Sequence, residues 1–183
     1  MAAGIAAALA LAGCALSPNS TNRPVGWPLK FKDHAFGSVC YSTLSCTVWY
    51  ASHWHGDEKP SPPPSKYGPD YLRYVDGTHV GIRGSPKSAE VTWQSMDGAH
   101  HYTEIDLADI FRDRLIRHNV PREEVADQPG GQLVVDPSII LEVNDRTVRI
   151  YMRSSIPLKH LEDPTNIHSD MRRDLVLVKT YNF

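Results

Sequence analysis

The stretch Ser138-Ile-Ile-Leu-Glu-Val-Asn-Asp-Arg-Thr-Val-Arg-Ile-Tyr-Met-Arg153 decides the expected fold of this 183-residue chain. Apolar side chains recur at every second position in both of its halves, which is the period of a β-strand with one buried face. The two halves meet at Asn144-Asp145, and these residue types favour tight turns. The stretch therefore predicts an antiparallel hairpin, with strands over residues 138–143 and 147–153.

Two more hairpins are expected upstream of this stretch. Asp-Gly is one of the strongest short-range signals for a hairpin turn, and it occurs at Asp76-Gly77 and at Asp97-Gly98. Both pairs lie between short runs that favour extended chain. The strands of these two hairpins, together with two single strands, are expected over residues 71–75, 79–83, 89–95, 102–106, 46–51 and 174–181.

One main helix is expected after residue 106. Asp106 is suited to cap its N-terminus, and Asp109 in the first turn complements the helix dipole. Pro121 stops the helix. The apolar residues that recur at helical spacing are Leu107, Ile110, Phe111 and Leu115. Because strands do not alternate with helices along the chain, we expect an α+β fold, an antiparallel sheet of hairpins with one main helix, in a single domain over residues 29–183.

Residues 52–69 are expected to form a long loop, since five Pro and two Gly in this span exclude a helix or a central strand. Long loops in compact domains are often functional, and aromatic side chains are common anchors of protein interfaces. Packing onto the domain is the alternative for the two aromatic side chains. The candidate partner-binding residues in this loop are Trp54, His55, Asp57, Glu58 and Tyr67.

The N-terminus resembles the export signal of bacterial lipoproteins. An uncharged apolar run over residues 1–13 ends in Leu11-Ala12-Gly13-Cys14, and a polar, Pro-rich stretch follows. The run is too short to span a bilayer, which takes roughly 20 residues, but it suits a signal-peptide core. An Ala-rich helix that happens to contain a Cys is the alternative. The resemblance implies a cleaved signal over 1–13, an acylated Cys14 that anchors the protein to a membrane, and a flexible tether over 14–28. Ala15 rather than Asp after this Cys implies the outer membrane.

Cys40 and Cys46 remain once Cys14 is assigned to the lipid. An even number of Cys in an exported chain indicates a disulfide, and a loop this short adds about 2 kcal/mol of stability on the chain-entropy estimate. The alternative of two free thiols finds no thiol-activating residues nearby. A zinc site would need a second Cys pair, which the sequence lacks.

Composition and motifs exclude several classes of function. A formal net charge of −2 and a pI near 6.5 give no indication of a nucleic-acid partner. Signatures of nucleophile elbows, phosphate loops and zinc proteases are missing. His53 and His55 share one side of an extended chain beside Asp57 and Glu58, but one His pair in a Pro-rich loop is a weak match to a metal site. We therefore predict no catalytic residues, no cofactor and no metal.

The chain as a whole resembles small lipoproteins encoded beside type VI secretion phospholipase effectors. The features that carry the resemblance are Leu11–Cys14, the Cys40/Cys46 pair, and the runs over residues 139–153 and 174–181. Such lipoproteins are immunity proteins that bind a cognate lipase toxin in the periplasm. The resemblance implies a membrane-anchored periplasmic immunity protein whose partner is a lipase effector. The alternatives are a structural or assembly accessory lipoprotein of the cell envelope or secretion apparatus, and a periplasmic hydrolase.

Overall fold

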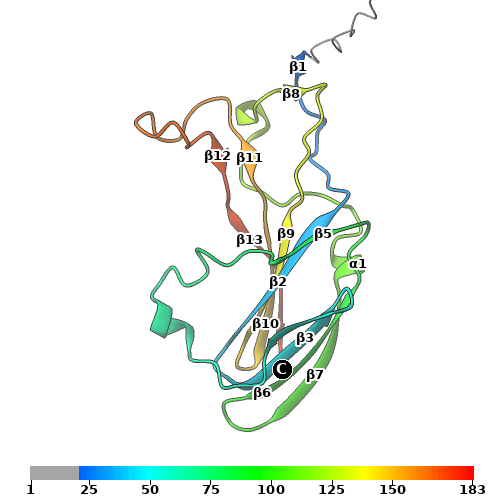
Figure 1. Ribbon diagram of the computed structural model, residues 1–183, viewed down its shortest axis with the longest axis vertical. Helices are drawn as coiled ribbons and strands as arrows, with labels where there is room; N and C mark the ends of the chain where they lie inside the picture. Colours follow the sequence, from blue (N-terminus) through cyan, green and yellow to red (C-terminus); the bar gives the residue numbers. More distant parts are fainter. Residues whose placement is uncertain (1–20) are drawn as a thin grey trace, which may run out of the picture.

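Two β-sheets pack face to face in the computed structural model, which describes residues 21–183 (Figure 1). The larger sheet has the strand order β13-β10-β9-β2-β5 and the smaller has the order β4-β3-β6-β7. Neighbouring strands are antiparallel except β2 and β9, which run parallel. In these orders, the larger sheet consists of Leu175–Asn182, Thr147–Arg153, Ser138–Asn144, His34–Tyr41 and His79–Ile82. The smaller sheet consists of His53–Asp57, Thr43–Tyr50, Ser88–Ser95 and His100–Asp106.

Alternate side chains of both sheets form the core between them. Phe36 on β2 stacks on Tyr50 of β3 with ring centroids 4.0 Å apart, which ties one sheet to the other. Burial of each large apolar side chain is worth about 1.5–3 kcal/mol, so this layer holds the two sheets together. Fully buried members of the layer include Val48, Val91, Trp93, Ile139, Leu141, Val143, Val148, Ile150 and Met152.

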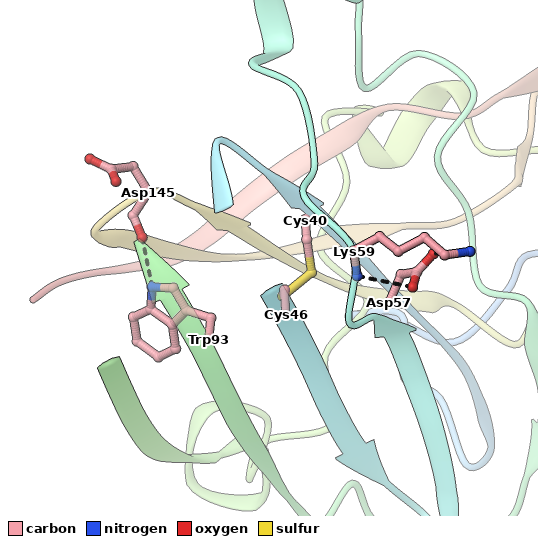
Figure 2. The surroundings of a disulfide bond; sticks show 6 residues. All are labelled: Cys40, Cys46, Asp57, Lys59, Trp93 and Asp145. Carbon is pink, nitrogen blue, oxygen red and sulfur yellow. Dashed lines mark hydrogen bonds and ion pairs between the residues drawn. A yellow bond between two sulfur atoms is a disulfide. The ribbon is translucent and has the colours of Figure 1, made fainter. Parts of the chain in front are cut away.

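The predicted disulfide is confirmed, and it joins the two sheets (Figure 2). Cys40 lies on β2 and Cys46 on β3, with Cα atoms 6.3 Å apart. Between them, Ser42 has a φ of 49° and turns the chain from one sheet into the other. A second link lies nearby, where the indole of Trp93 donates to the carbonyl of Asp145 at 2.7 Å (Figure 2). The passage of the chain between the sheets is therefore fixed by a covalent bond and a hydrogen bond.

Two of the three predicted hairpins are confirmed. Strands β9 and β10 pair across Asn144-Asp145, and strands β6 and β7 pair across Asp97-Gly98. The final strand is also present, as β13. These are the places where alternation and turn residues point to the same structure.

The α+β prediction is wrong, because residues 21–183 are 46% strand and only 7% helical. The expected main helix is reduced to α1, Leu107–Ile110. Asp106 does cap it, by accepting a hydrogen bond from the backbone of Asp109 at 2.9 Å. The helix ends at Ile110, and a turn over residues 111–113 leads to Arg114, whose φ of 59° redirects the chain. Residues 114–116 then exchange backbone hydrogen bonds with residues 29–31, and this pairing replaces the later turns of the helix.

The hairpin predicted across Asp76-Gly77 is also wrong. Residues 71–74 form a turn, and β5 pairs with β2 instead of with them. The physical reason is that the Arg153 guanidinium donates hydrogen bonds of 2.6–3.0 Å to the backbone carbonyls of Leu72, Arg73 and Val75. A side chain of the larger sheet thus satisfies backbone groups that a strand partner would have used.

The segment expected to be a loop contains a strand. Residues 53–57 form β4, which pairs with β3 along the edge of the smaller sheet. The Pro residues begin only after it, and the 3-10 turn η1 (Pro64–Tyr67) follows. Because Pro cannot donate to a strand ladder, the strand ends before the first Pro.

Short elements extend the sandwich at the end where the described chain begins (Figure 1). β1 (Asn22–Arg23) pairs with β8 (Gln128–Pro129), and β11 (Ile156–Pro157) pairs with β12 (Met171–Arg172). A second 3-10 turn, η2, covers Arg122–Glu124. The β6–β7 hairpin lies toward the opposite end of the molecule from β1 (Figure 1).

The predicted signal peptide over 1–13 and Cys14 lie outside the described residues. The same holds for the expected tether as far as residue 20. From residue 21 onward the tether contacts the domain, through the β1–β8 pair and through Val25, which is buried. Within residues 21–183 no helix has the length and apolar character needed to cross a membrane.

Candidate functional site

The five candidate partner-binding residues do not form one surface. Trp54 points outward from β4 and is 71% exposed, whereas His55 points inward, where its ring lies 5.1 Å from that of Phe36. Asp57 and Glu58 are exposed at the end of the strand. Tyr67 lies outside the other sheet, against Tyr41 at 5.7 Å between ring centroids.

Trp54 belongs to a different surface, the uncovered outer face of the smaller sheet. It is paired with Trp49 on β3, and the two indole centroids are 4.7 Å apart. The register continues this row through Glu90 on β6 to Glu104 on β7. Tyr102 lies on the same face in the next row and is 64% exposed. We call these five residues the aromatic–acidic face.

The charges of this face all have one sign. None of the four strands of the smaller sheet contains a Lys or an Arg. Glu90 and Glu104 are exposed and directly opposite each other, and neither forms an ion pair within residues 21–183. Like charges directly opposite on neighbouring strands are destabilising. The fold therefore retains an unfavourable pair beside the aromatic side chains of this face.

The outer face of the larger sheet is covered, unlike that of the smaller. Residues 64–77, which we call the cover segment, cross it and bury β9 on both sides. Glu142 on β9 is fully buried and accepts hydrogen bonds from Tyr71 at 2.8 Å, Tyr151 at 2.9 Å and Arg149 at 3.3 Å. A buried carboxylate with this many donors is explained by structure, because its charge is paired and its oxygens are satisfied.

The cover segment lies directly on β2. A Cβ added to Gly37 would come within 2.3 Å of the carbonyl oxygen of Asp76. A Cβ on Gly77 would meet the methyl group of Ala35 at 2.6 Å. Glycine at both positions permits this close contact between backbones. The cover segment is therefore part of the packed structure, which leaves the smaller sheet as the one with an open face.

Three histidines meet where β4 and β5 face each other. The ring of His79 is 4.0 Å from that of His53 and 5.8 Å from that of His55, measured between centroids. His55 Nε2 and His79 Nδ1 are buried and have no hydrogen-bond partner within the described residues. Burial, and then the neighbouring imidazoles, lower the pKa of His55 and of His79. Across residues 21–183, no three or more His, Cys, Asp or Glu side chains are arranged to hold a metal ion.

A fourth histidine, His34, is buried and has a strongly lowered pKa. Its Nε2 lies 2.6 Å from the Tyr50 hydroxyl, and both side chains are buried in the core. Burial lowers the pKa of His34 to about 4 and raises the pKa of Tyr50 to about 12. Both groups are therefore neutral at pH 7. Asp33 points elsewhere and accepts from the backbone of Gly84 at 2.9 Å, so it does not orient the imidazole as in a catalytic dyad.

A groove between α1 and β13 is the main competing surface. Four of its five charged side chains form ion pairs, and Lys179 is the fifth: Arg112 lies 3.4 Å from Asp109, and Arg117 lies 2.8 Å from Asp113. The four paired charges are already compensated, in contrast to those of Glu90 and Glu104. The aromatic–acidic face is for this reason the stronger candidate for a binding site.

Trp49 was not predicted from the sequence as a site residue, and neither were Glu90, Tyr102 and Glu104. The signal for the last three was present in the alternation of residues 89–106, which places every second side chain on the face away from the core. The register that aligns them with Trp49 and Trp54 depends on pairing between strands far apart in the sequence. Pairing of that kind cannot be read from the spacing within one segment.

Comparison with known proteins gives no relative from which a function could be transferred. No protein-family model matches the chain, and neither a curated protein nor a solved structure is significantly similar to it.

Proposed function

We propose that this chain is a membrane-anchored periplasmic immunity lipoprotein that neutralises a cognate type VI secretion lipase effector by binding it through the aromatic–acidic face. The lipid anchor and the class of partner come from the resemblance of the sequence to such lipoproteins. The surface comes from the structure. Its central observation is the exposed Trp54, packed on the half-buried Trp49, beside two carboxylates without a paired cation within residues 21–183.

The composition of the face suits recognition of a protein. Trp and Tyr supply large contact areas at interfaces, and residues of this kind dominate binding energies. Trp54 and Tyr102 are both more than half exposed in the free protein, at 71% and 64%. Their apolar area is thus available for burial against a partner.

The charges of the face favour a basic partner surface. A Lys or Arg side chain placed between Glu90 and Glu104 would relieve their mutual repulsion and could stack on the neighbouring Trp49. Charge complementarity of this kind mainly raises the association rate and the specificity. We therefore expect binding to weaken as the salt concentration rises.

The position of the anchor is compatible with this role. Cys14 precedes β1 by few residues, and β1 lies at the end of the molecule away from the β6–β7 hairpin (Figure 1). A protein tethered at that end keeps the smaller sheet accessible. Anchoring also raises the local concentration of the binder at the membrane, where a lipase acts.

The proposal predicts that a lipase gene lies beside the gene for this chain, and the direct test is a protection assay with that lipase. Cells that direct the lipase to the periplasm should survive when they express the protein and die without it. Trp54→Ala and Glu104→Lys should each weaken binding of the purified proteins about tenfold or more, as expected for central interface residues. Tyr74→Ala is the matched control, because Tyr74 is 86% exposed on the cover segment, outside the face.

Two results would contradict the proposal. The first is an absence of protection against the neighbouring lipase. The second is equal binding by the wild type, Trp54→Ala and Glu104→Lys, which would place the interface elsewhere. Cys14→Ser tests the anchor separately: it should move the protein out of the membrane fraction and reduce protection, while binding in solution stays unchanged.

A further inference from the structure

The three histidines between β4 and β5 occupy a structurally sensitive position. His53 and His55 are on β4, the edge strand of the smaller sheet, and His79 is on β5, the edge strand of the larger sheet. The two strands belong to different sheets, so this side of the sandwich is closed by side chains and not by backbone hydrogen bonds. We call the three residues the histidine cluster.

Within residues 21–183, the surroundings of the cluster contain no negative charge that would stabilise a protonated imidazole. The Nδ1 of His53 forms a hydrogen bond with the carbonyl of Ala51 at 3.0 Å. Within residues 21–183, no carboxylate lies within ion-pair distance of any of the three rings. The other side chains near the cluster are uncharged at pH 7: Phe36 and His34 on β2, and Tyr50 on β3. Nothing in this surrounding compensates added positive charge.

We propose that the histidine cluster is a pH-sensitive latch that opens the β4 edge of the sandwich when two or more of its imidazoles become protonated. Centroids 4.0 and 5.8 Å apart would then carry like charges. His79 is common to both contacts, so its protonation affects both members of β4. Among the described residues, β4 and β5 each pair with one strand, and β4 carries two of the three histidines, so we assign the opening to β4.

Opening of β4 disrupts the aromatic–acidic face, because the two sides of this strand carry different residues. Its inward side carries His53 and His55, and its outward side carries Trp54. Movement of the strand separates Trp54 from Trp49 and dismantles the aromatic part of the aromatic–acidic face. The consequence for binding rests on the proposed function. The opening of β4 does not depend on the proposed function, and it can be measured on the purified protein without a partner.

Amide hydrogen exchange of the purified protein tests the latch. Protection of the β4 amides should fall about tenfold between about pH 7.5 and about pH 5.5, after correction for the intrinsic exchange rate, because an imidazole exposed by opening, with an ordinary pKa of about 6.5, is protonated about ten times more often than neutral at about pH 5.5. Protection in β6 and β7 should stay constant over this range and serves as an internal reference. In the double variant His53→Asn/His79→Asn, β4 should keep its protection at the lower pH.

His100→Asn is the matched control, because His100 is an exposed histidine on the far edge strand β7. This variant should respond to pH as the wild type does. If the double variant does not fold, His53→Asn alone, at an exposed position, should reduce the response. Equal loss of protection in β4 and β6, or a full response in the variants that lack His53, would overturn the latch. A protein that shows the latch but binds no lipase at either pH would instead count against the proposed function.

Discussion

Glu90 on β6 and Glu104 on β7 lie directly opposite each other on an open sheet face, and no cation in the described part of the chain, residues 21–183, is paired to either. Opposite-charge cross-strand pairs contribute roughly 0.2–1 kcal/mol of stability, and like-charge pairs remove it. The chain thus gives up stability at a position where a different residue would supply it. Retained strain of this kind is typical of a surface selected for contact with something else.

Glu104→Lys should therefore stabilise the protein while it weakens partner binding. The new Lys would face Glu90, and we expect the free energy of unfolding to rise by about 0.5 kcal/mol. Urea unfolding followed by circular dichroism measures this change as a higher midpoint at constant slope. Glu123→Lys makes the same charge change at an exposed position on η2 and should leave stability nearly unchanged. A lower midpoint for Glu104→Lys would show that its carboxylate supports the fold.

The hydrogen bond of the Tyr71 hydroxyl should contribute strongly to holding the cover segment on the larger sheet. Tyr71→Phe removes its hydrogen bond to the buried Glu142 carboxylate, and bonds to charged groups contribute about 1.5–3 kcal/mol. We expect a loss of that size in urea unfolding, together with faster proteolysis within residues 64–77. Tyr67→Phe is the matched control, since the Tyr67 hydroxyl has no hydrogen-bond partner within residues 21–183 and the ring is 56% exposed. Equal effects of the two substitutions would mean that the Glu142 contact does not hold the cover segment.

Gly37 should tolerate no side chain. Gly37→Ala would force its methyl group against the backbone carbonyl of Asp76, which lies 2.3 Å from the Cβ position. Overpacking of a buried site costs about 1–3 kcal/mol, and a backbone obstacle cannot move aside as a flexible side chain can. Gly26→Ala is the control, because no atom lies within 4 Å of its Cβ position. Comparison of the two urea midpoints tests whether the cover segment lies as close to β2 as the structure shows.

Local sequence signals predicted those parts of the fold in which neighbours along the chain are also neighbours in space. The Asp97-Gly98 and Asn144-Asp145 hairpins are of this kind, as is the Cys40–Cys46 disulfide. Asp76-Gly77 carries the same turn signal, yet its flanking residues are held by Arg153, which lies far along the sequence. The same local pattern thus has a different outcome when a distant side chain satisfies the backbone.

The expected helix and the expected binding loop failed for related reasons. The helical spacing of Leu107 and Phe111 is real, and both side chains are fully buried, but the chain beyond them pairs with residues 29–31. Trp54 and Tyr67 are close in sequence, yet they lie on the outer sides of two different sheets. The register between strands that are distant in the sequence determines which residues share a surface. Local sequence patterns do not predict that register.

The buried histidine in the core predicts how stability depends on pH. Burial lowers the pKa of His34 to about 4, so the unfolded state, with an ordinary imidazole pKa of about 6.5, takes up a proton first as the pH falls. The neutral His34 contributes to the free energy of unfolding. This contribution is fully present above about pH 6.5 and is lost progressively as the pH falls toward about 4. This one residue should lower the free energy of unfolding by about 1.4 kcal/mol per pH unit within that window.

His34→Gln should remove this share of the pH dependence. The variant loses stability at neutral pH, because Gln fills the core less well and pairs differently with Tyr50. Its free energy of unfolding should then fall less steeply than that of the wild type between about pH 6.5 and about pH 4.5. Urea unfolding at several pH values measures the two slopes, and His100→Asn should reproduce the wild-type slope. If His34→Gln were as steep as the wild type, the protonation that destabilises the fold would lie elsewhere, with His55 and His79 as the next groups to test.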